Sequence, residues 1–190
     1  MNENELINKT KEGDVSSFKV LIELYQDMVL NTAFGFLKNK DDSEDITQDV
    51  FIKVYKTISK FKGDSKFSTW LYRITINESL NFLKSKKRRN LFFIFSSENE
   101  DQVYDIPDTG SNSPSEVSEN TERRKILYKA IDSLAENQKI AYTLSKIDGM
   151  SYSEIAEIMG TTISSVESLL NRAKKKLKLK LEKFYKNEMI

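Results

Sequence analysis

Apolar residues recur at intervals of three and four along most of the chain, which is the spacing of one face of an α-helix. Residues 14–37 carry the first such stripe, and residues 41–60 carry a second one behind an acidic first turn. Gly63 and Asp64 interrupt the pattern, and a third helix is expected from near Ser68 to about residue 89. No alternating strand pattern of useful length is present. The N-terminal part therefore predicts a helical domain.

The C-terminal part is also predicted to be helical. Helices are expected over residues 121–133, 136–147, 152–159 and 164–185. Ser151 and Glu154 have the spacing of a capping box, and Ser164 and Glu167 repeat that spacing. Gly160 separates the two capped helices. A short helix, a glycine-containing turn and a second helix form the pattern of a helix-turn-helix.

Residues 90–120 differ in composition from both flanks. They contain both prolines of the chain, Pro107 and Pro114, with Gly110 and many Ser, Asn and acidic residues. Such a segment buries too little apolar surface to offset the entropy of ordering it. The sequence therefore predicts an all-α fold of two small helical domains, 1–89 and 121–190, joined by an acidic flexible linker over 90–120. The apolar run Leu91–Phe95 could cover a groove of its own domain or dock on a partner protein.

Charge is distributed unevenly, although the net charge is only +1. Residues 1–89 carry a net charge of +3, residues 90–122 carry −8, and residues 123–190 carry +6. Two basic blocks on either side of an acidic one suggest two domains that face nucleic acid. Two ordinary solvated domains with a polar linker remain the alternative.

The composition disfavours an enzyme. Cysteine and histidine are both absent, which removes disulfides, thiolate zinc sites, thiol nucleophiles and imidazole acid–base chemistry. No glycine-rich phosphate loop or Ser–Lys pair stands out, so no catalytic residue, cofactor or metal site is predicted. The polar N-terminus lacks the apolar core of a signal peptide, and no apolar stretch reaches the roughly 20 residues that cross a bilayer. A cytoplasmic protein without membrane insertion is expected.

The last helix predicts a DNA-reading face. On a helical wheel, Val166, Leu170, Ala173 and Leu177 form an apolar stripe, and small polar residues followed by cations lie opposite. The opposite face comprises Ser164, Ser168, Asn171, Arg172 and Lys175. Such a helix suits the major groove at its start and phosphates at its end. A plain helical hairpin with a solvated face is the alternative.

The third N-terminal helix carries a second candidate surface. Its members recur at spacings of three and four: Lys66, Trp70, Arg73, Asn77, Asn81 and Lys84. An indole, a guanidinium and amides beside cations can stack on bases, bond their edges and hold phosphates, which suits single-stranded nucleic acid. A tryptophan buried in the core is the competing interpretation.

A third surface is acidic. Asp45, Gln48, Asp49 and Ile52 lie along the second helix, and DNA would repel their carboxylates. In a DNA-binding protein this face fits a basic protein partner. Carboxylates that only complement the helix dipole are the alternative.

Taken in order, these segments resemble the sigma-70 family, and specifically its two-domain extracytoplasmic-function members. Residues 42–51 (DSEDITQDVF) are similar to the family helix that grips the polymerase clamp, and residues 61–74 (FKGDSKFSTWLYRI) to the segment that opens and reads the −10 element. Residues 151–160 (SYSEIAEIMG), with the helix after them, resemble the −35 reader. The run Phe67–Ile74 is the most specific part of the match.

The resemblance implies a sigma factor without catalytic activity, whose partners are RNA polymerase core, promoter DNA and an anti-sigma factor. It implies core contacts by Asp45, Gln48, Asp49, Phe51 and Ile52. It implies −10 contacts by Lys62, Lys66, Phe67, Ser68, Trp70, Arg73, Asn77, Asn81 and Lys84. It implies −35 contacts by Ser164, Ser165, Ser168, Asn171, Arg172 and Lys175.

The recognition helix departs from the common family pattern at two positions. Glu167 and Leu169 stand where members often have Lys or Arg, which weakens the positive field at the groove. The capping box explains Glu167, and affinity is then expected to depend on Arg172 and the lysines that follow. The alternative function is a stand-alone helix-turn-helix regulator of duplex DNA, which leaves the Trp70 and acidic faces unexplained.

Overall fold

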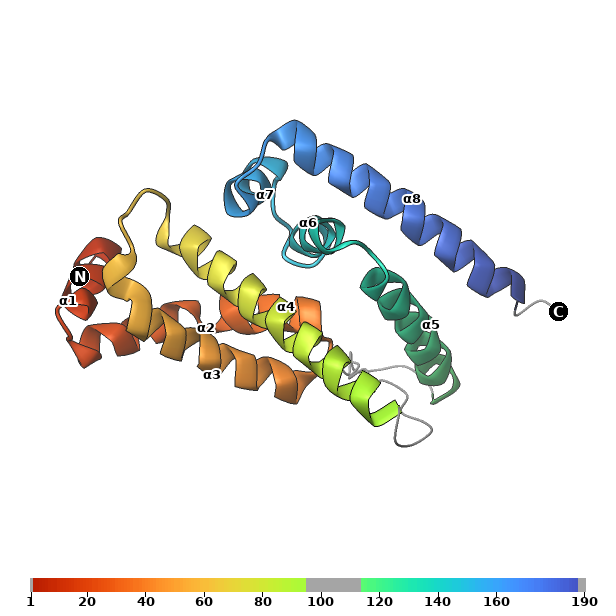
Figure 1. Cartoon of the computed structure of the whole chain (residues 1–190), viewed down its shortest axis with the longest axis horizontal. Helices are drawn as coiled ribbons and strands as arrows, with labels where there is room; N and C mark the ends of the chain where they lie inside the picture. Colours follow the sequence, from red (N-terminus) through yellow and green to blue (C-terminus); the bar gives the residue numbers. More distant parts are fainter. Residues whose placement is uncertain (1, 95–113, 188–190) are drawn as a thin grey trace. The chain divides into compact units, whose positions relative to one another are not determined.

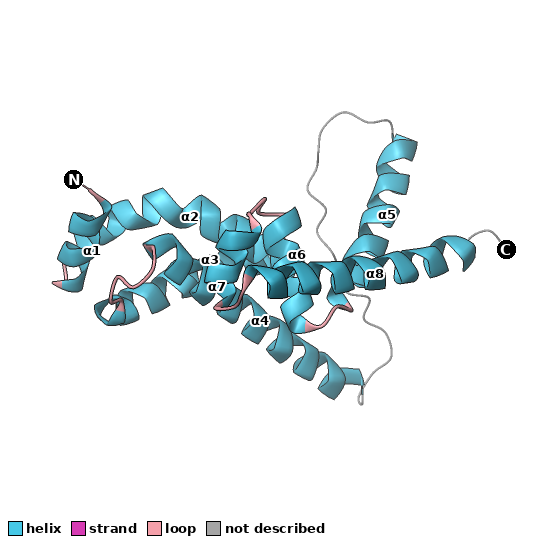
Figure 2. Ribbon diagram, turned by 90° about the horizontal axis from the view of Figure 1, so that it is seen from above, coloured by secondary structure: helices cyan, strands magenta, loops and turns pink. Residues whose placement is uncertain are grey.

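A computed structural model gives the fold of the chain for residues 2–94 and 114–187, with side chains placed for 2–89 and 122–184. The regular structure in these ranges is helical throughout (Figure 2). The chain divides into two compact units. Unit 2 comprises residues 102–190, and unit 1 comprises the residues that precede them. The predicted all-α architecture with two helical domains is confirmed.

In its described residues, 2–94, unit 1 contains four α-helices and one short 3-10 helix (Figure 1). The elements are α1 (Glu3–Lys11), α2 (Val15–Leu37), α3 (Lys40–Thr57), η1 (Ile58–Lys60) and α4 (Phe67–Ile94). Helical backbone thus extends into the predicted linker as far as Ile94. The side chains of the Leu91–Phe95 run lie outside the described residues, as does the segment 95–113.

Side-chain caps define where the first three helices begin. Asn2 caps α1 in a capping box with Glu5, Asp14 accepts from the backbone N–H groups of Ser16 and Ser17, and Asn39 accepts from that of Asp42 at 2.8 Å. The chain leaves α2 at Lys38, a residue in the left-handed conformation with φ of 56°. These polar residues convert one long stretch of amphipathic sequence into three separate helices.

The core of unit 1 lies around α2, which packs against α1, α3 and α4. Leu21 and Val29 of α2 meet Val50 and Val54 of α3 and Leu71 of α4, all at 1% exposure or less. Burying each such side chain stabilises the fold by about 1.5–3 kcal/mol relative to leaving it in water. This core fixes the outer faces of α3 and α4.

Helix α1 is not predicted from the sequence pattern. It buries Leu6 and Ile7 against α2 and closes the open end of the aromatic cluster described below. The signal was present, because Asn2 and Glu5 have the same capping-box spacing as Ser151 and Glu154.

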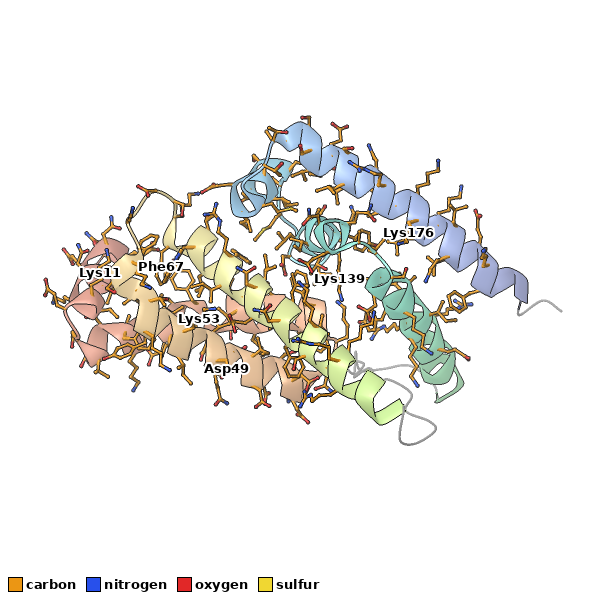
Figure 3. All side chains as sticks on the ribbon, in the orientation of Figure 1. Lys11, Asp49, Lys53, Phe67, Lys139 and Lys176 are labelled. Atoms are coloured by element: carbon orange, nitrogen blue, oxygen red, sulfur yellow. The ribbon has the colours of Figure 1, made fainter. Side chains whose placement is uncertain are left out.

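Unit 2 contains α5 (Pro114–Asp132), α6 (Glu136–Lys146), α7 (Tyr152–Met159) and α8 (Ile163–Asn187). The long α8 packs against the other three. Its stripe of Val166, Leu170, Ala173 and Leu177 is at most 5% exposed, which confirms the predicted core face. A buried lysine, Lys139, bonds Asp132 across the turn between α5 and α6 (Figure 3).

Candidate nucleic-acid interface

The helix-turn-helix is built on two capping motifs. Ser151 accepts from the backbone N–H of Glu154, and the Glu154 carboxylate accepts from that of Ser151, so the predicted box is confirmed. At the other end, Gly160 adopts a φ of 62°, and Thr161 donates its N–H to Ala156 at 2.9 Å. This is a Schellman ending, which needs a residue that tolerates positive φ. It ends α7 at the residue predicted.

The second predicted box is wrong. Helix α8 begins at Ile163, and the hydroxyl of Thr162 accepts from the backbone N–H of Ser165 at 3.2 Å. Ser164 is therefore inside the first turn, and Glu167 lies too far along the helix to reach back to the cap. Thr162 is the capping residue, and Glu167 is left without the structural role that the spacing suggested.

The exposed face of α8 brings the predicted −35 residues together. Ser164, Ser168, Asn171, Arg172 and Lys175 are all exposed, and they line a shallow hollow of about 390 Å³. Ser165 lies beside them, half-buried and bonded to the Thr162 hydroxyl at 2.9 Å.

Two further contacts order this face. The guanidinium of Arg172 donates to the hydroxyl of Ser168 at 2.9 Å and to its carbonyl at 3.3 Å, which holds the cation against the helix one turn back. Lys176 instead donates to the carbonyl of Ser133 at 2.6 Å, just past the end of α5 (Figure 3). Lys176 therefore ties α8 to the turn that follows α5.

The second surface lies on α4. Arg73, Asn77, Asn81 and Lys84 are exposed along α4 at spacings of three and four, and Lys66, also exposed, lies just before the helix begins. The predicted face is thus a continuous row of polar and cationic side chains.

Trp70 joins this row to the core. Its side chain is half-buried, with ring centroids 5.3 Å from Phe61 and 5.7 Å from Phe67. One part of the indole packs on unit 1, and the rest is open to solvent. An aromatic ring held this way is pre-oriented for stacking.

Phe67 has a different position from the one expected of a DNA contact. It is 2% exposed, and its ring meets Tyr25 at 5.4 Å and Phe61 at 5.5 Å as well as Trp70. In this structure Phe67 is a core residue that packs beneath Trp70. Lys62 is exposed and Ser68 half-buried in the segment around it.

Helix α1 completes the aromatic cluster. Tyr25 donates its hydroxyl to Glu3 at 2.6 Å, and the ammonium of Lys11 lies 5.6 Å from the Phe61 ring centroid. Burial and the bond to Glu3 raise the pKa of Tyr25, so this hydroxyl stays protonated. Figure 3 shows Lys11 and Phe67 at the same end of unit 1. The sequence did not predict these contacts because it did not predict α1.

The acidic face of α3 is exposed at Asp45, Gln48, Asp49 and Ile52, and Figure 3 shows Asp49 on the outer side of the helix. Within the described part of the chain, no hydrogen bond or ion pair engages these carboxylates. Ile52 is 52% exposed beside them. An apolar side chain among unpaired carboxylates is suited to a protein partner rather than to water alone.

Phe51 does not belong to that face. It is 7% exposed, and its ring lies edge-on to Phe18 of α2 with centroids 6.5 Å apart. Tyr55, which the pattern of the second helix places on its apolar stripe with Phe51, is exposed one turn beyond Ile52. The position of Phe51 next to Val50 on the core side of the helix accounts for the difference.

Other site types find no support in the described ranges. No cluster of three or more acidic, His or Cys side chains there could hold a metal ion. The described helices include none with both the length and the apolar character to cross a membrane.

Comparisons with known proteins find a matching family model for each unit. The family model of Sigma-70 region 2 matches residues 21–89, which contain the acidic and Trp70 faces. The model of Sigma-70, region 4 matches residues 124–177, which contain the helix-turn-helix.

Similar proteins match over nearly the whole chain. The ECF RNA polymerase sigma-E factor of Haemophilus influenzae is 31% identical over 185 residues, covering 96% of each chain. Its counterpart in Escherichia coli K12 is 32% identical over 180 residues, covering 93% of each. Among solved structures, the sigma factor RpoE of Bartonella quintana, in complex with the anti-sigma factor NepR, has the same fold: TM-score 0.62, 24% identity, coverage of 88% of this chain and 98% of that one. CnrH, in complex with the cytosolic domain of CnrY, also has a TM-score of 0.62, with 21% identity and coverage of 93% and 95%.

Proposed function

The chain belongs to the sigma-70 family, and we propose that it is an alternative sigma factor of the extracytoplasmic-function type, which directs RNA polymerase core to promoters. The observation that carries this proposal is the presence of regions 2 and 4 on one chain, each in its own helical unit. The sigma-E relatives match over nearly their whole length.

Unit 2 is proposed to read the −35 element. The start of α8 would enter the major groove, with Ser164, Ser165 and Ser168 near base edges and Asn171, Arg172 and Lys175 toward the phosphates. Support comes from the exposure of these residues, apart from the half-buried Ser165, and from the separate buried stripe that packs α8 on its own unit.

Unit 1 is proposed to open and read the −10 element. The half-exposed indole of Trp70 would stack on an unpaired base, Arg73 and Asn77 would contact the same strand, and Lys62 and Ser68 would flank an extruded base. Extrusion costs a few kcal/mol, which stacking and the cations Lys66 and Lys84 must offset. Asn81 extends the polar row on α4.

The acidic face of α3 is proposed as the contact to polymerase core. Asp45, Gln48, Asp49 and Ile52 supply charge and one apolar anchor, and the unpaired state of the carboxylates supports this role. Phe51 would act only from within the core. An anti-sigma factor is proposed as a further partner.

Sigma factors are not catalytic enzymes, and we extend this to the chain, which is proposed to work without chemistry of its own in the cytoplasm, where polymerase acts. We propose the domain limits 1–89 and 121–190 for the two regions. The stand-alone regulator is not favoured, because it gives no task to the region 2 unit.

Transcription with purified components tests the proposal. The chain is added to RNA polymerase core on a library of promoter fragments, and transcript starts are sequenced. We expect starts at a defined promoter class only when both chain and core are present, and weak binding of the chain alone to duplex DNA. Tight duplex binding without any effect on core would refute the proposal and support the regulator.

A further inference from the structure

The hollow on the exposed face of α8 contains one carboxylate among its neutral and cationic residues. Glu167 lines the same hollow as Ser164, Ser168, Asn171, Arg172 and Lys175. Along the helix it lies between Ser164, three residues before it, and Asn171, four residues after it, so it belongs to the row that would face base edges.

No structural task accounts for this carboxylate. The cap of α8 is Thr162, so Glu167 does not hold the start of the helix. Among the described residues, Glu167 makes no hydrogen bond or ion pair, and the guanidinium of Arg172 is directed to Ser168 instead. The charge is therefore free to meet a ligand in the groove.

A carboxylate beside DNA is repelled by phosphates unless a hydrogen-bond donor compensates it. The major groove offers two exocyclic amino donors, N4 of cytosine and N6 of adenine. Adenine also presents the acceptor N7 next to its amino group, which would repel the second carboxylate oxygen. Guanine presents O6 and N7 and thymine presents O4, and these acceptors repel Glu167 outright. Cytosine is the base that a carboxylate selects.

We infer that Glu167 is a specificity-determining residue whose carboxylate accepts a hydrogen bond from the N4 amino group of one cytosine in the −35 element. This inference rests on the proposed function, because it requires α8 to lie in the major groove of a promoter. It also changes the meaning of the departure from the family pattern. With Glu167 in place of a cation, the helix has a lower affinity for DNA of any sequence but gains a preference for one base.

The test is initiation by the full chain with polymerase core on promoters randomised over the −35 element. The wild-type chain is expected to prefer C at one position by about 5- to 150-fold over the other bases, the range that follows from one base contact. Glu167→Ala should lose the preference at that position alone. Glu167→Gln should shift it to A, because an amide bonds N6 and N7 of adenine together.

Glu182→Gln is the matched control. It removes the same charge from the same helix, at an exposed carboxylate near the far end of α8 that pairs with Lys178 at 3.9 Å. The control should leave every base preference unchanged. Glu167→Ala and Glu167→Gln should unfold at the wild-type temperature, since the side chain is exposed and caps nothing.

Three outcomes overturn the inference in different ways. If the Glu167 variants raise initiation equally on all sequences, the carboxylate only lowers affinity and reads no base. If the wild-type chain gives no promoter-specific initiation at all, the proposed function itself fails. A −35 preference that is present but unaffected at every position by Glu167→Ala removes this inference and leaves the proposed function standing.

Discussion

Replacing Phe67 by Ala distinguishes a core residue from a DNA contact. The ring is 2% exposed and lies 5.4 Å from Tyr25, 5.5 Å from Phe61 and 5.7 Å from Trp70. Asn77 lies on the same helix, α4, and is exposed. The family resemblance assigns both residues to the −10 surface. In the structure, Phe67 lies beneath that surface and Asn77 lies on it.

The expected loss of stability follows from this burial. Truncating a buried Phe to Ala costs about 3–5 kcal/mol in lost transfer free energy and cavity formation. Loss of the ring-to-ring contacts, about 0.5–1.5 kcal/mol per pair, is part of that cost. With a urea m-value of about 1–3 kcal/mol per molar for a small domain, the midpoint should fall by at least about 1 M.

Urea unfolding followed by tryptophan fluorescence measures the effect directly. Trp70 is the one tryptophan of the chain, and it contacts Phe67, so its emission reports unit 1 rather than unit 2. Asn77→Ala is the comparison: we expect its stability within about 0.5 kcal/mol of wild type. Promoter opening should nevertheless decrease in Asn77→Ala at saturating core.

One result would refute the reasoning about Phe67. If Phe67→Ala unfolds within about 1 kcal/mol of wild type and loses promoter opening as Asn77→Ala does, the ring contacts DNA and does not support the surface. Phe67 would then be a −10 DNA contact, as the family resemblance implied.

Three further predictions concern the other surfaces. Asp49→Lys should weaken binding to polymerase core, measured by titration with labelled core, while binding of −10 single strand by the variant stays at the wild-type level; an unchanged core affinity would count against the acidic face. Lys175→Ala should weaken DNA binding about equally for all sequences and reduce the salt slope of log K by about one, measured between low and moderate salt; a change in base preference would instead make Lys175 a reader. Thr162→Ala should lower the unfolding free energy of unit 2 by about 1 kcal/mol, measured by thermal denaturation. Glu167→Ala should leave this free energy unchanged. An equal loss in both variants would instead support a capping box formed by Ser164 and Glu167.

Much of the helical architecture could be predicted from local sequence. The 3.6-residue periodicity places Val166, Leu170, Ala173 and Leu177 on one face, and that face must be buried whatever the partner. Gly160 could be predicted as the end of α7 because few other residues adopt its left-handed conformation. These features depend on interactions within a few residues of each other.

The errors come from choices that local sequence leaves open. Thr162 and Ser164 are both good caps, and in the structure the helix begins directly after Thr162. Phe51 and Ile52 are adjacent and both apolar, and only the packing of α3 on α2 decides that the first is buried and the second exposed. Helix α1 is short, and its stability comes from contacts with α2, which a pattern along the chain does not show.

The separation of the two faces of α8 has a consequence for how such a protein can change. Residues that hold the helix in place point inward, and residues that would meet bases point outward, so exchanging Ser164, Glu167, Ser168 or Asn171 should alter stability by only about 0.5 kcal/mol each. A gene copy could therefore acquire a new set of target promoters without passing through an unfolded intermediate. For the same reason, α8 is a suitable scaffold for engineering sigma factors that recognise separate promoters within one cell.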